Sequence, residues 1–259
     1  MMQPESWRWA LAAVAGGLIG LSKTGVPGLA TPVVPFLAAV FGSRPSVGIM
    51  VLMLICGDCF AVAWYRRHAQ WSRLLKLLPW VLTGMGVGAA ALALTGRLQS
   101  STDWLGLLIG LLVVAMVVLH VLQQRVPEHL TPRSPAGTAL TGVAAGFATT
   151  TANAAGPVMS LYFLAHRLTK EQFLGTGAWY YLTLNVAKVP LYIALTAMNP
   201  RDPVITLRSL WLVLAAAPAL ITGALAGRWI LPRMPQKGFD AVVLILATGS
   251  ALYLIAKSL

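Results

Sequence analysis

Two lysines, Lys23 and Lys188, lie inside apolar sequence, where a positive charge is rare. Lys23 interrupts the first apolar region, and Lys188 is far from both ends of the apolar segment Phe173–Ala197. Placing a charged side chain at membrane depth costs at least ~2.5–3.5 kcal/mol on insertion scales. We therefore expect each ammonium group to bind a partner that offsets this cost, and an anionic substrate is one such partner.

A polar stripe surrounds the second of these lysines. Tyr181, Asn185, Lys188 and Tyr192 recur at spacings of three and four residues, which places them on one face of a helix. Such groups can replace the water around an anion. The alternative is structural, because Lys188 could pair with Asp58, the only acid deep inside an apolar span.

Two polar interruptions supply further donors, SKTGVPG from Ser22 and TTTANAAGP from Thr149. A helix that restarts at such a break points its N-terminus, and so its positive dipole end, at the cavity. An oxyanion presents several acceptors and suits a site made of donors. The alternative is that the hydroxyls only satisfy the backbone of broken helices. The predicted substrate contacts are Ser22, Lys23, Thr24, Thr149, Thr150, Thr151, Asn153, Tyr181, Asn185 and Lys188.

Asp58 lies in the segment ICGDC, between the chain's two cysteines. A buried carboxyl group that titrates could couple proton movement to transport, whereas a permanent lysine partner would make it structural. Cys56 and Cys59 form a C-x-x-C pattern, which supports a rival hypothesis of an intramembrane thiol-disulfide redox protein. Such a relay needs cysteines on two facing elements, and the second half has none, so we interpret both as small hydrophobic residues.

Other functional classes find no support in the residue pattern. The four histidines lie in or beside loops without metal-ligand spacing, and no nucleophile–base set or nucleotide-binding loop is present. We therefore expect no enzyme activity, metal or cofactor. The net charge of +12 is spread over short loops, so nucleic acid is not an expected partner.

The composition is that of an integral membrane protein. Of the 259 residues, 58% are hydrophobic and 10% charged, whereas soluble domains carry about 25% charged residues. A span of the hydrocarbon core needs roughly 20 apolar residues. The segments that qualify are Val47–Tyr65, Leu74–Thr95, Trp104–Leu122, Phe173–Ala197, Leu207–Leu231 and Phe239–Ala256.

Two other apolar regions, Trp7–Phe41 and Ala136–Ala165, are too long for one span and are interrupted near the middle. The densest basic cluster lies in the loop YRRHAQWSRLLK from Tyr65, and the positive-inside rule puts it in the cytoplasm. Counting outward places both ends of Ala136–Ala165 inside and both ends of Trp7–Phe41 outside. Each region is therefore expected to be a re-entrant hairpin or a pair of short helices.

The two halves of the chain resemble each other. LLPWVLTGMGVG from Leu77 matches AAPALITGALAG from Ala216, and each half contains one interrupted hairpin and three spans. An odd number of full crossings inverts the second half. The predicted fold is therefore an all-α membrane protein, a single membrane domain over 1–259, with inverted repeats at 1–128 and 129–259. Transporters of this kind bind substrate near the midplane, at the breaks.

The chain resembles the TauE/SafE family of sulfite exporters over nearly its whole length. The resemblance rests on GLIGLSKTGVPGLATPVVP, on GFATTTANAAGPVMSLYFL and on the short basic loop after the second apolar segment. It implies movement of sulfite, thiosulfate or a small organosulfonate such as sulfoacetate, usually outward.

The resulting hypothesis is a multi-pass secondary transporter of the bacterial inner membrane. Its partners are the lipid bilayer, a small anionic substrate and a coupling proton at Asp58. The runner-up within transport is a carrier of a carboxylate or other small organic anion. The runner-up outside transport is the thiol-disulfide redox protein.

Overall fold

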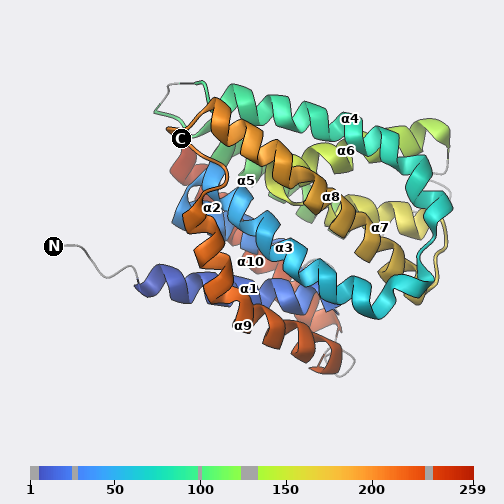
Figure 1. Cartoon of the computed structure of the whole chain (residues 1–259). Coiled ribbons are helices and arrows are strands. Elements are labelled where there is room, and N and C mark those ends of the chain that lie inside the picture. The colour runs from blue at the N-terminus through green and yellow to red at the C-terminus, as the bar shows by residue number, and fades with distance from the viewer. Residues whose placement is uncertain (1–5, 25–28, 99–100, 124–133, 231–235) are drawn as a thin grey trace.

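The chain is built of helices, as the sequence predicts (Figure 1). The computed structural model describes residues 6–24, 29–98, 101–123, 134–230 and 236–259, and within these ranges it contains no strand. The α-helices are α1 (Ser6–Thr24), α2 (Val33–Phe41), α3 (Ser43–Tyr65), α4 (Trp71–Thr95), α5 (Trp104–Gln123), α6 (Pro135–Ala152), α7 (Gly156–Ala165), α8 (Lys170–Met198), α9 (Leu207–Ile230) and α10 (Gln236–Ser258), with a 3₁₀ turn, η1 (Arg66–His68), after α3.

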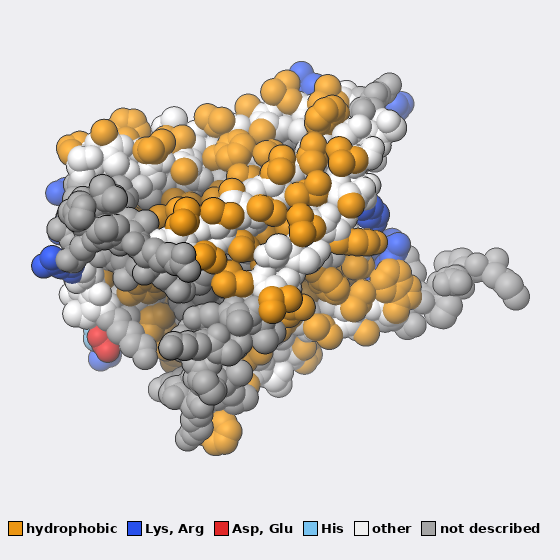
Figure 2. Space-filling view, turned by 180° about the vertical axis from the view of Figure 1, so that it is seen from behind, with side chains coloured by type: hydrophobic (Ala, Val, Ile, Leu, Met, Phe, Trp, Pro, Cys, Tyr) orange, Lys and Arg blue, Asp and Glu red, His pale blue; other side chains and the backbone are white. Residues whose placement is uncertain are grey.

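Helices of membrane-spanning length form the frame. Among the described residues, four are long and apolar enough to cross a bilayer, and two shorter apolar helices accompany them. Hydrophobic side chains cover the middle of the face seen in Figure 2, while Lys and Arg gather toward its ends. The long helices are Ser43–His68, Trp71–Thr95, Glu171–Met198 and Leu207–Gly227, and the shorter ones are Trp104–Leu119 and Leu244–Ser258. The prediction of an integral membrane protein is thereby confirmed.

The first interrupted region folds back on itself (Figure 1). Arg8 at the start of α1 and Val40 at the end of α2 line the same cleft, so the two arms open at one end of the bundle. Gly42, at φ +92°, lets α3 begin directly after α2, a backbone conformation that glycine adopts without steric cost.

The second interrupted region is also a hairpin, but it opens at the other end. In α6, Gly142 lies against Trp80, and in α7 the Tyr162 hydroxyl donates to the carbonyl of Arg73 at 3.3 Å. Both arms therefore return to the first turns of α4. Since α4 begins after α3 has crossed the bundle from Ser43 to Tyr65, the two hairpins enter from opposite ends.

Both breaks begin later than the polar sequence suggests. Ser22, Lys23 and Thr24 form the last turn of α1, and α6 continues through the threonines to Ala152. The threonine hydroxyls allow this because they bond the carbonyl one turn earlier, as Thr150 does to Gly146 at 2.9 Å. The second break starts at Asn153, in the left-handed conformation at φ 51°. Gly25–Gly28, the middle of the first predicted break, lie outside the described residues.

Helices of the first half pack against helices of the second half at two close contacts. α1 packs against α9 and α4 against α6, each pair running in the same direction. At both contacts glycine lets backbones touch, because a Cβ on Gly20 would collide with Leu220 and one on Gly84 with Val143. Two such contacts between the halves are what a two-fold repeat would produce, while the division into 1–128 and 129–259 stays a prediction.

A polar clasp closes the end of the bundle where α3 begins. Arg44 is only 3% exposed; its Nε lies 3.2 Å from Asp202 Oδ2, and its Nη1 donates to the carbonyl of Leu92. Asn199 donates to the carbonyl of Gly96 at 2.6 Å. These contacts fasten α3, α4 and the loop before α9 together. Partial burial raises the pKa of the Asp202 carboxyl, and Arg44 opposes the rise.

Candidate functional site

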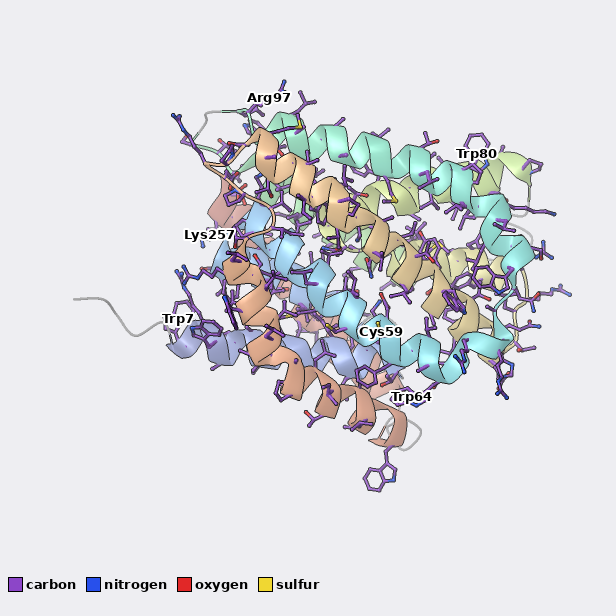
Figure 3. All side chains as sticks on the ribbon, in the orientation of Figure 1. Trp7, Cys59, Trp64, Trp80, Arg97 and Lys257 are labelled. Carbon is purple, nitrogen blue, oxygen red and sulfur yellow. The ribbon has the colours of Figure 1, made fainter. Side chains whose placement is uncertain are left out.

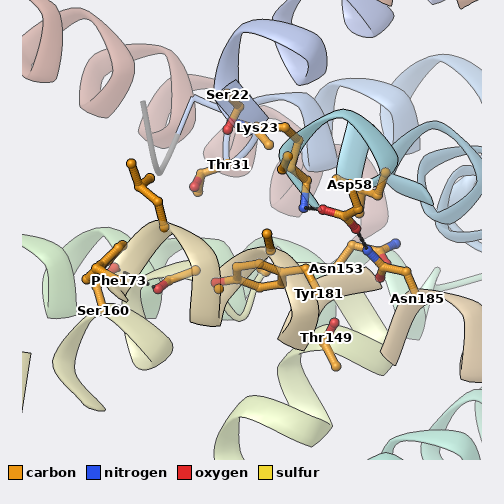
Figure 4. A pocket seen from close by; sticks show the side chains of 18 residues that line it. Ser22, Lys23, Thr31, Asp58, Thr149, Asn153, Ser160, Phe173, Tyr181 and Asn185 are labelled. Atoms are coloured by element: carbon orange, nitrogen blue, oxygen red, sulfur yellow. Dashed lines mark hydrogen bonds and ion pairs between the residues drawn. The ribbon is translucent and has the colours of Figure 1, made fainter. Parts of the chain in front are cut away.

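A cavity lies where the tips of the two hairpins meet α3 and α8 (Figure 4). It encloses about 100 Å³, several times the space that one water molecule needs. The end of α1 and the start of α2 form one wall, and the break between α6 and α7 forms another. Its residues are Ser22, Lys23, Ala30, Thr31, Leu54, Asp58, Ala61, Thr149, Asn153, Ala154, Gly156, Ser160, Phe173, Leu174, Gly177, Ala178, Tyr181 and Asn185.

An ion pair marks the polar end of this cavity. Lys23 Nζ lies 2.6 Å from Asp58 Oδ1, and Asn185 Nδ2 donates to Asp58 Oδ2 at 2.6 Å. Asp58 is fully buried, whereas the Lys23 side chain is 11% exposed. Among the described lining residues, Lys23 is the one cation and Asp58 the one anion. The carboxylate therefore occupies the position that an anionic ligand of Lys23 would compete for.

Two neighbours hold Lys23 in place. Its ammonium lies over the ring of Tyr181, 4.4 Å from the centroid, a favourable cation–π geometry. Its Cγ lies where a Cβ on Gly57 would come within 2.9 Å, so only glycine allows α1 and α3 to approach this closely. The Tyr181 hydroxyl bonds no described residue, which leaves it available to a ligand.

Lys188 has different partners from those the sequence suggested. The structural alternative paired it with Asp58, but the partner of Asp58 is Lys23. Lys188 is fully buried and donates to the carbonyl and hydroxyl of Thr149, at 2.9 and 3.0 Å, and to Asn153 Oδ1 at 2.6 Å. It caps the C-terminal end of α6, where a cation is favoured by the helix dipole.

The structure brings together six of the ten predicted substrate contacts. Those that line the cavity are Ser22, Lys23, Thr149, Asn153, Tyr181 and Asn185. Lys188 lies behind this wall and reaches it through Thr149 and Asn153. The predicted polar stripe on α8 faces inward throughout, and at its far end the Tyr192 hydroxyl donates to the carbonyl of Thr150 at 2.7 Å.

The other three predicted contacts bond the backbone and do not line the cavity. Thr24 donates to the carbonyl of Ala224 at 2.7 Å and thereby fastens α1 to α9. Thr150 and Thr151 donate to carbonyls within α6, at 2.9 and 2.8 Å. These hydroxyls match the alternative in which threonines satisfy broken helices.

Thr31, Ser160 and Phe173 also line the cavity but were not predicted. Thr31 and Gly156 each precede a proline at the start of a short helix, and the sequence signal for them was this shared X-Pro pattern after each break. Ser160 follows one turn into α7, and its hydroxyl donates to the carbonyl of Gly156 at 3.0 Å. Phe173 carries no polar group, so no sequence pattern marks it as a possible substrate contact.

The short helices α2 and α7 both start at the cavity wall. Ala30 and Thr31 precede α2, while Ala154 and Gly156 lie at the start of α7. The helix dipole makes the N-terminal end of each helix positive, while in α2 the N–H groups of Val33 and Val34 already donate to the carbonyls of Ala30 and Thr31. The predicted polar residues lie at the ends of α1 and α6, and it is the following helices that point their N-termini inward.

The donors converge on the cavity from several helices. Lys23 comes from α1, Thr149 from α6, and Asn185 and Tyr181 from α8. The described lining contains no arginine, whose planar fork would favour a flat carboxylate. No group of acidic, histidine or cysteine side chains among the described residues could hold a metal ion. The arrangement suits a small oxyanion with acceptors pointing in several directions.

The two cysteines lie outside this cavity. Cys56 is half-buried and Cys59 exposed on α3, both as free thiols, and neither lines the cavity (Figure 3). The chain has no further cysteine that could face them. The C-x-x-C pattern therefore lacks the second pair that a relay would use.

One comparison with known proteins gives a match. The profile of a family described as "Sulfite exporter TauE/SafE" matches residues 8–254. The match includes both hairpins, the cavity and the four helices that are long and apolar enough to cross a membrane among the described residues. Comparison with curated proteins and with solved structures gives no match.

Proposed function

Because the chain belongs to the TauE/SafE sulfite exporter family, a family of membrane transporters for sulfur-containing anions, we propose that it exports such an anion through the cavity at the hairpin tips. The transported anion is sulfite, thiosulfate or a small organosulfonate such as sulfoacetate. The protein acts as a secondary transporter of the inner membrane.

The observation that carries this proposal is the Lys23–Asp58 pair. Lys23 reaches into the cavity with 11% of its side chain exposed, and only one of its neighbours is an acid. An ammonium group has three N–H donors. Lys23 can therefore bind a ligand oxygen whether its ion pair with Asp58 breaks or remains. The site thus contains a positive group at membrane depth whose present partner can be exchanged.

The chemistry of the walls supports a sulfur oxyanion. The polar end contains Lys23, Thr149 and Asn185, which come from three different helices and can each offer a donor to an oxyanion. Toward Phe173 and Leu174 the lining is mostly apolar, with Ser160 beside Phe173. This part can accept the carbon of an organosulfonate or the terminal sulfur of thiosulfate. The cavity volume of about 100 Å³ is compatible with a small anion.

Asp58 links anion binding to a proton. In the empty site Asp58 neutralises Lys23, so an incoming anion meets a carboxylate that repels it and competes for the same ammonium. Protonation of Asp58 removes both obstacles. We propose that the anion and this proton occupy the site together.

The position of the cavity supports loading from the cytoplasm. Its lining follows α8 from Asn185 back to Phe173, toward the end that the basic loops place in the cytoplasm. At the opposite end the Arg44 clasp fastens α3 and α4 to the loop before α9. An exporter would take up its substrate from a cavity that faces the cytoplasm in this way. Three bases of the other loops that are assigned to the cytoplasm, Arg125, Arg133 and Arg233, lie outside the described residues.

We propose that the chain is built of two inverted repeats, which would explain why the two breaks meet. Two observations support repeats at 1–128 and 129–259. The hairpins enter from opposite ends, and helices of the two halves contact each other as the pairs α1–α9 and α4–α6. A two-fold axis in the membrane plane would then pass near the cavity. Alternating access would follow if the two halves rock against each other around it.

A binding screen tests the proposal. Full-length protein purified in detergent is titrated with sulfite, thiosulfate, sulfoacetate, taurine and acetate, and binding is measured by calorimetry. We expect one of the first three to bind most tightly. Preferred binding of acetate would favour the carboxylate alternative, and absence of binding by all five would contradict the proposal.

The same screen on Lys23→Met tests the site. The substitution removes a charge-assisted donor, worth ~1.5–3 kcal/mol, so affinity should fall roughly tenfold to a hundredfold. Arg97→Gln is a suitable control because Arg97 is an exposed base after α4, outside the cavity. Unchanged affinity in Lys23→Met would move the binding site elsewhere.

A further inference from the structure

A second cleft lies at the end of the bundle where the first hairpin opens (Figure 3). The start of α1, α2 from Pro35 onward and the last turns of α10 line it, and its volume is about 480 Å³. No acidic residue is found among its described lining residues. It is separate from the central cavity, since the two share no lining residue.

Two cations border the outer end of this cleft. The Arg8 guanidinium lies 5.4 Å from the ring centroid of Trp7. Lys257 donates one of its three ammonium protons to the carbonyl of Ala39 at 2.7 Å. That contact places the charge beside the end of α2 and leaves other protons for a ligand.

The inner part of the cleft is mainly apolar, and the hydroxyl of its polar lining residue Ser250 donates to the carbonyl of Leu246 at 2.6 Å. Pro35 and Phe36 of α2 line it, and along α10 it extends from Lys257 to Ser250, a distance of about 10 Å at 1.5 Å per residue. The cleft therefore has a positive end and an apolar floor, in the order that the headgroup and acyl chain of a lipid require.

The surrounding aromatic residues place the cleft at a membrane interface. Trp7 is 49% exposed and Tyr253 61% exposed, and tryptophan and tyrosine concentrate at the level of the headgroups. In Figure 2, basic side chains border the hydrophobic surface near the N-terminal end of the chain. A soluble ligand would gain nothing from the apolar floor beneath the cations.

We propose that this cleft binds an anionic phospholipid, with its phosphodiester on Arg8 and Lys257 and the first part of an acyl chain along Phe36. Such a lipid joins α10 to both arms of the hairpin that carries Lys23 at its tip. It would steady the hairpin from its open end. The proposal is independent of the transported substrate.

Lipid titration of the full-length protein tests this site. Protein in neutral detergent is mixed with phosphatidylglycerol or phosphatidylcholine, and bound lipid is measured by native mass spectrometry. We expect a preference for phosphatidylglycerol, and Arg8→Gln/Lys257→Gln should weaken its binding about tenfold to thirtyfold, since each base near a surface contributes ~1 kcal/mol. Arg97→Gln/Arg201→Gln removes two other exposed bases and should leave the preference intact.

The remaining outcomes overturn the proposal. Equal loss in both double variants would mean a general charge effect, and retained preference in Arg8→Gln/Lys257→Gln would exclude these contacts. Competition by inorganic phosphate as strong as by the lipid would mean a phosphate site without a role for the apolar floor. If the double variant melts lower than the wild type without lipid, Lys257→Gln alone is used, with a smaller loss expected.

Discussion

The break that ends α1 and the break between α6 and α7 each use a lysine, but in different ways. At the first break the lysine belongs to the broken helix itself, and Lys23 enters the cavity and pairs with Asp58 at 2.6 Å. At the second break the lysine comes from a neighbouring helix, and Lys188 binds Thr149 and Asn153 from outside the cavity. The Lys23 ammonium can contact a ligand in the cavity, whereas the Lys188 ammonium stabilises the cavity wall.

This difference separates two tasks that a charge at membrane depth can perform. Lys188 donates to three neutral acceptors and is fully enclosed, so its contacts are satisfied by the protein. Lys23 is held by one acid that can be neutralised. A buried lysine is therefore a candidate substrate contact when its partner can change, and not merely because it is buried.

Removing Lys23 should have the largest effect on stability. Lys23→Met leaves the Asp58 carboxylate buried without its counter-ion, a loss of about 3–5 kcal/mol. The measurement is the unfolding temperature of the purified protein in detergent. At lower pH Asp58 becomes protonated, so the difference from the wild type should shrink as the pH falls.

The matched control is Lys23→Met/Asp58→Asn, which removes both charges. It should recover most of the lost stability but not the anion affinity. If the double variant is as unstable as Lys23→Met, the ion pair is not what stabilises this end of α1. If it binds anions as the wild type does, Lys23 is only structural.

Glycine substitutions test whether the two contacts between the halves, α1–α9 and α4–α6, are equivalent. A Cβ on Gly84 would collide with Val143 of α6, and one on Gly223 with Gly17 of α1. Gly84→Ala and Gly223→Ala should each destabilise by about 1–3 kcal/mol through overpacking. Gly86→Ala, with open space around its Cβ, should not destabilise. A loss at only one of the two contacts would argue against the repeat.

The sequence predicted the fold well because membrane helices are defined by local composition. The apolar length of Leu74–Thr95 and the interruption of Ala136–Ala165 are visible without tertiary contacts, and α4, α6 and α7 match them closely. The residues at which the helices end were harder to predict. The threonine hydroxyls of α6 bond carbonyls of their own helix, so that the helix continues past Thr149.

The partners of charged side chains could not be derived from spacing. Asp58 had two candidate lysines at membrane depth, and the choice depends on the Gly57 contact that brings α1 close to α3. That contact joins residues far apart in the chain. The exposed fraction and direction of a side chain in a cavity likewise depend on how several helices pack.

Lys188 should affect binding less than Lys23 and by another route. Lys188→Met leaves the Thr149 carbonyl and Asn153 Oδ1 without their donor, so the wall of the cavity loosens and affinity should fall about tenfold, equal to 1.4 kcal/mol. Calorimetry measures the loss. Asn153→Asp keeps an acceptor for Lys188 and should preserve stability better than Lys188→Met. A larger loss of affinity than in Lys23→Met would reverse the comparison of the two lysines.

The cysteines should have the smallest effect. Cys56→Ser/Cys59→Ser should leave transport of the anion from proteoliposomes into the surrounding medium unchanged, because neither thiol lines the cavity. A thiol-disulfide exchange assay on the wild type serves as the complementary readout. Complete loss of transport in this variant, together with exchange activity in the wild type, would support the redox alternative.

The pH dependence of thiosulfate affinity tests the central claim, that Asp58 and the anion compete for Lys23. Thiosulfate keeps its charge as the pH is lowered from about 8 to about 6, so any change reports on the protein. We expect wild-type affinity to increase as the pH falls, and Asp58→Asn to bind tightly at every pH in this range. Affinity that is independent of pH in the wild type, or weaker in Asp58→Asn than in the wild type, would contradict the account.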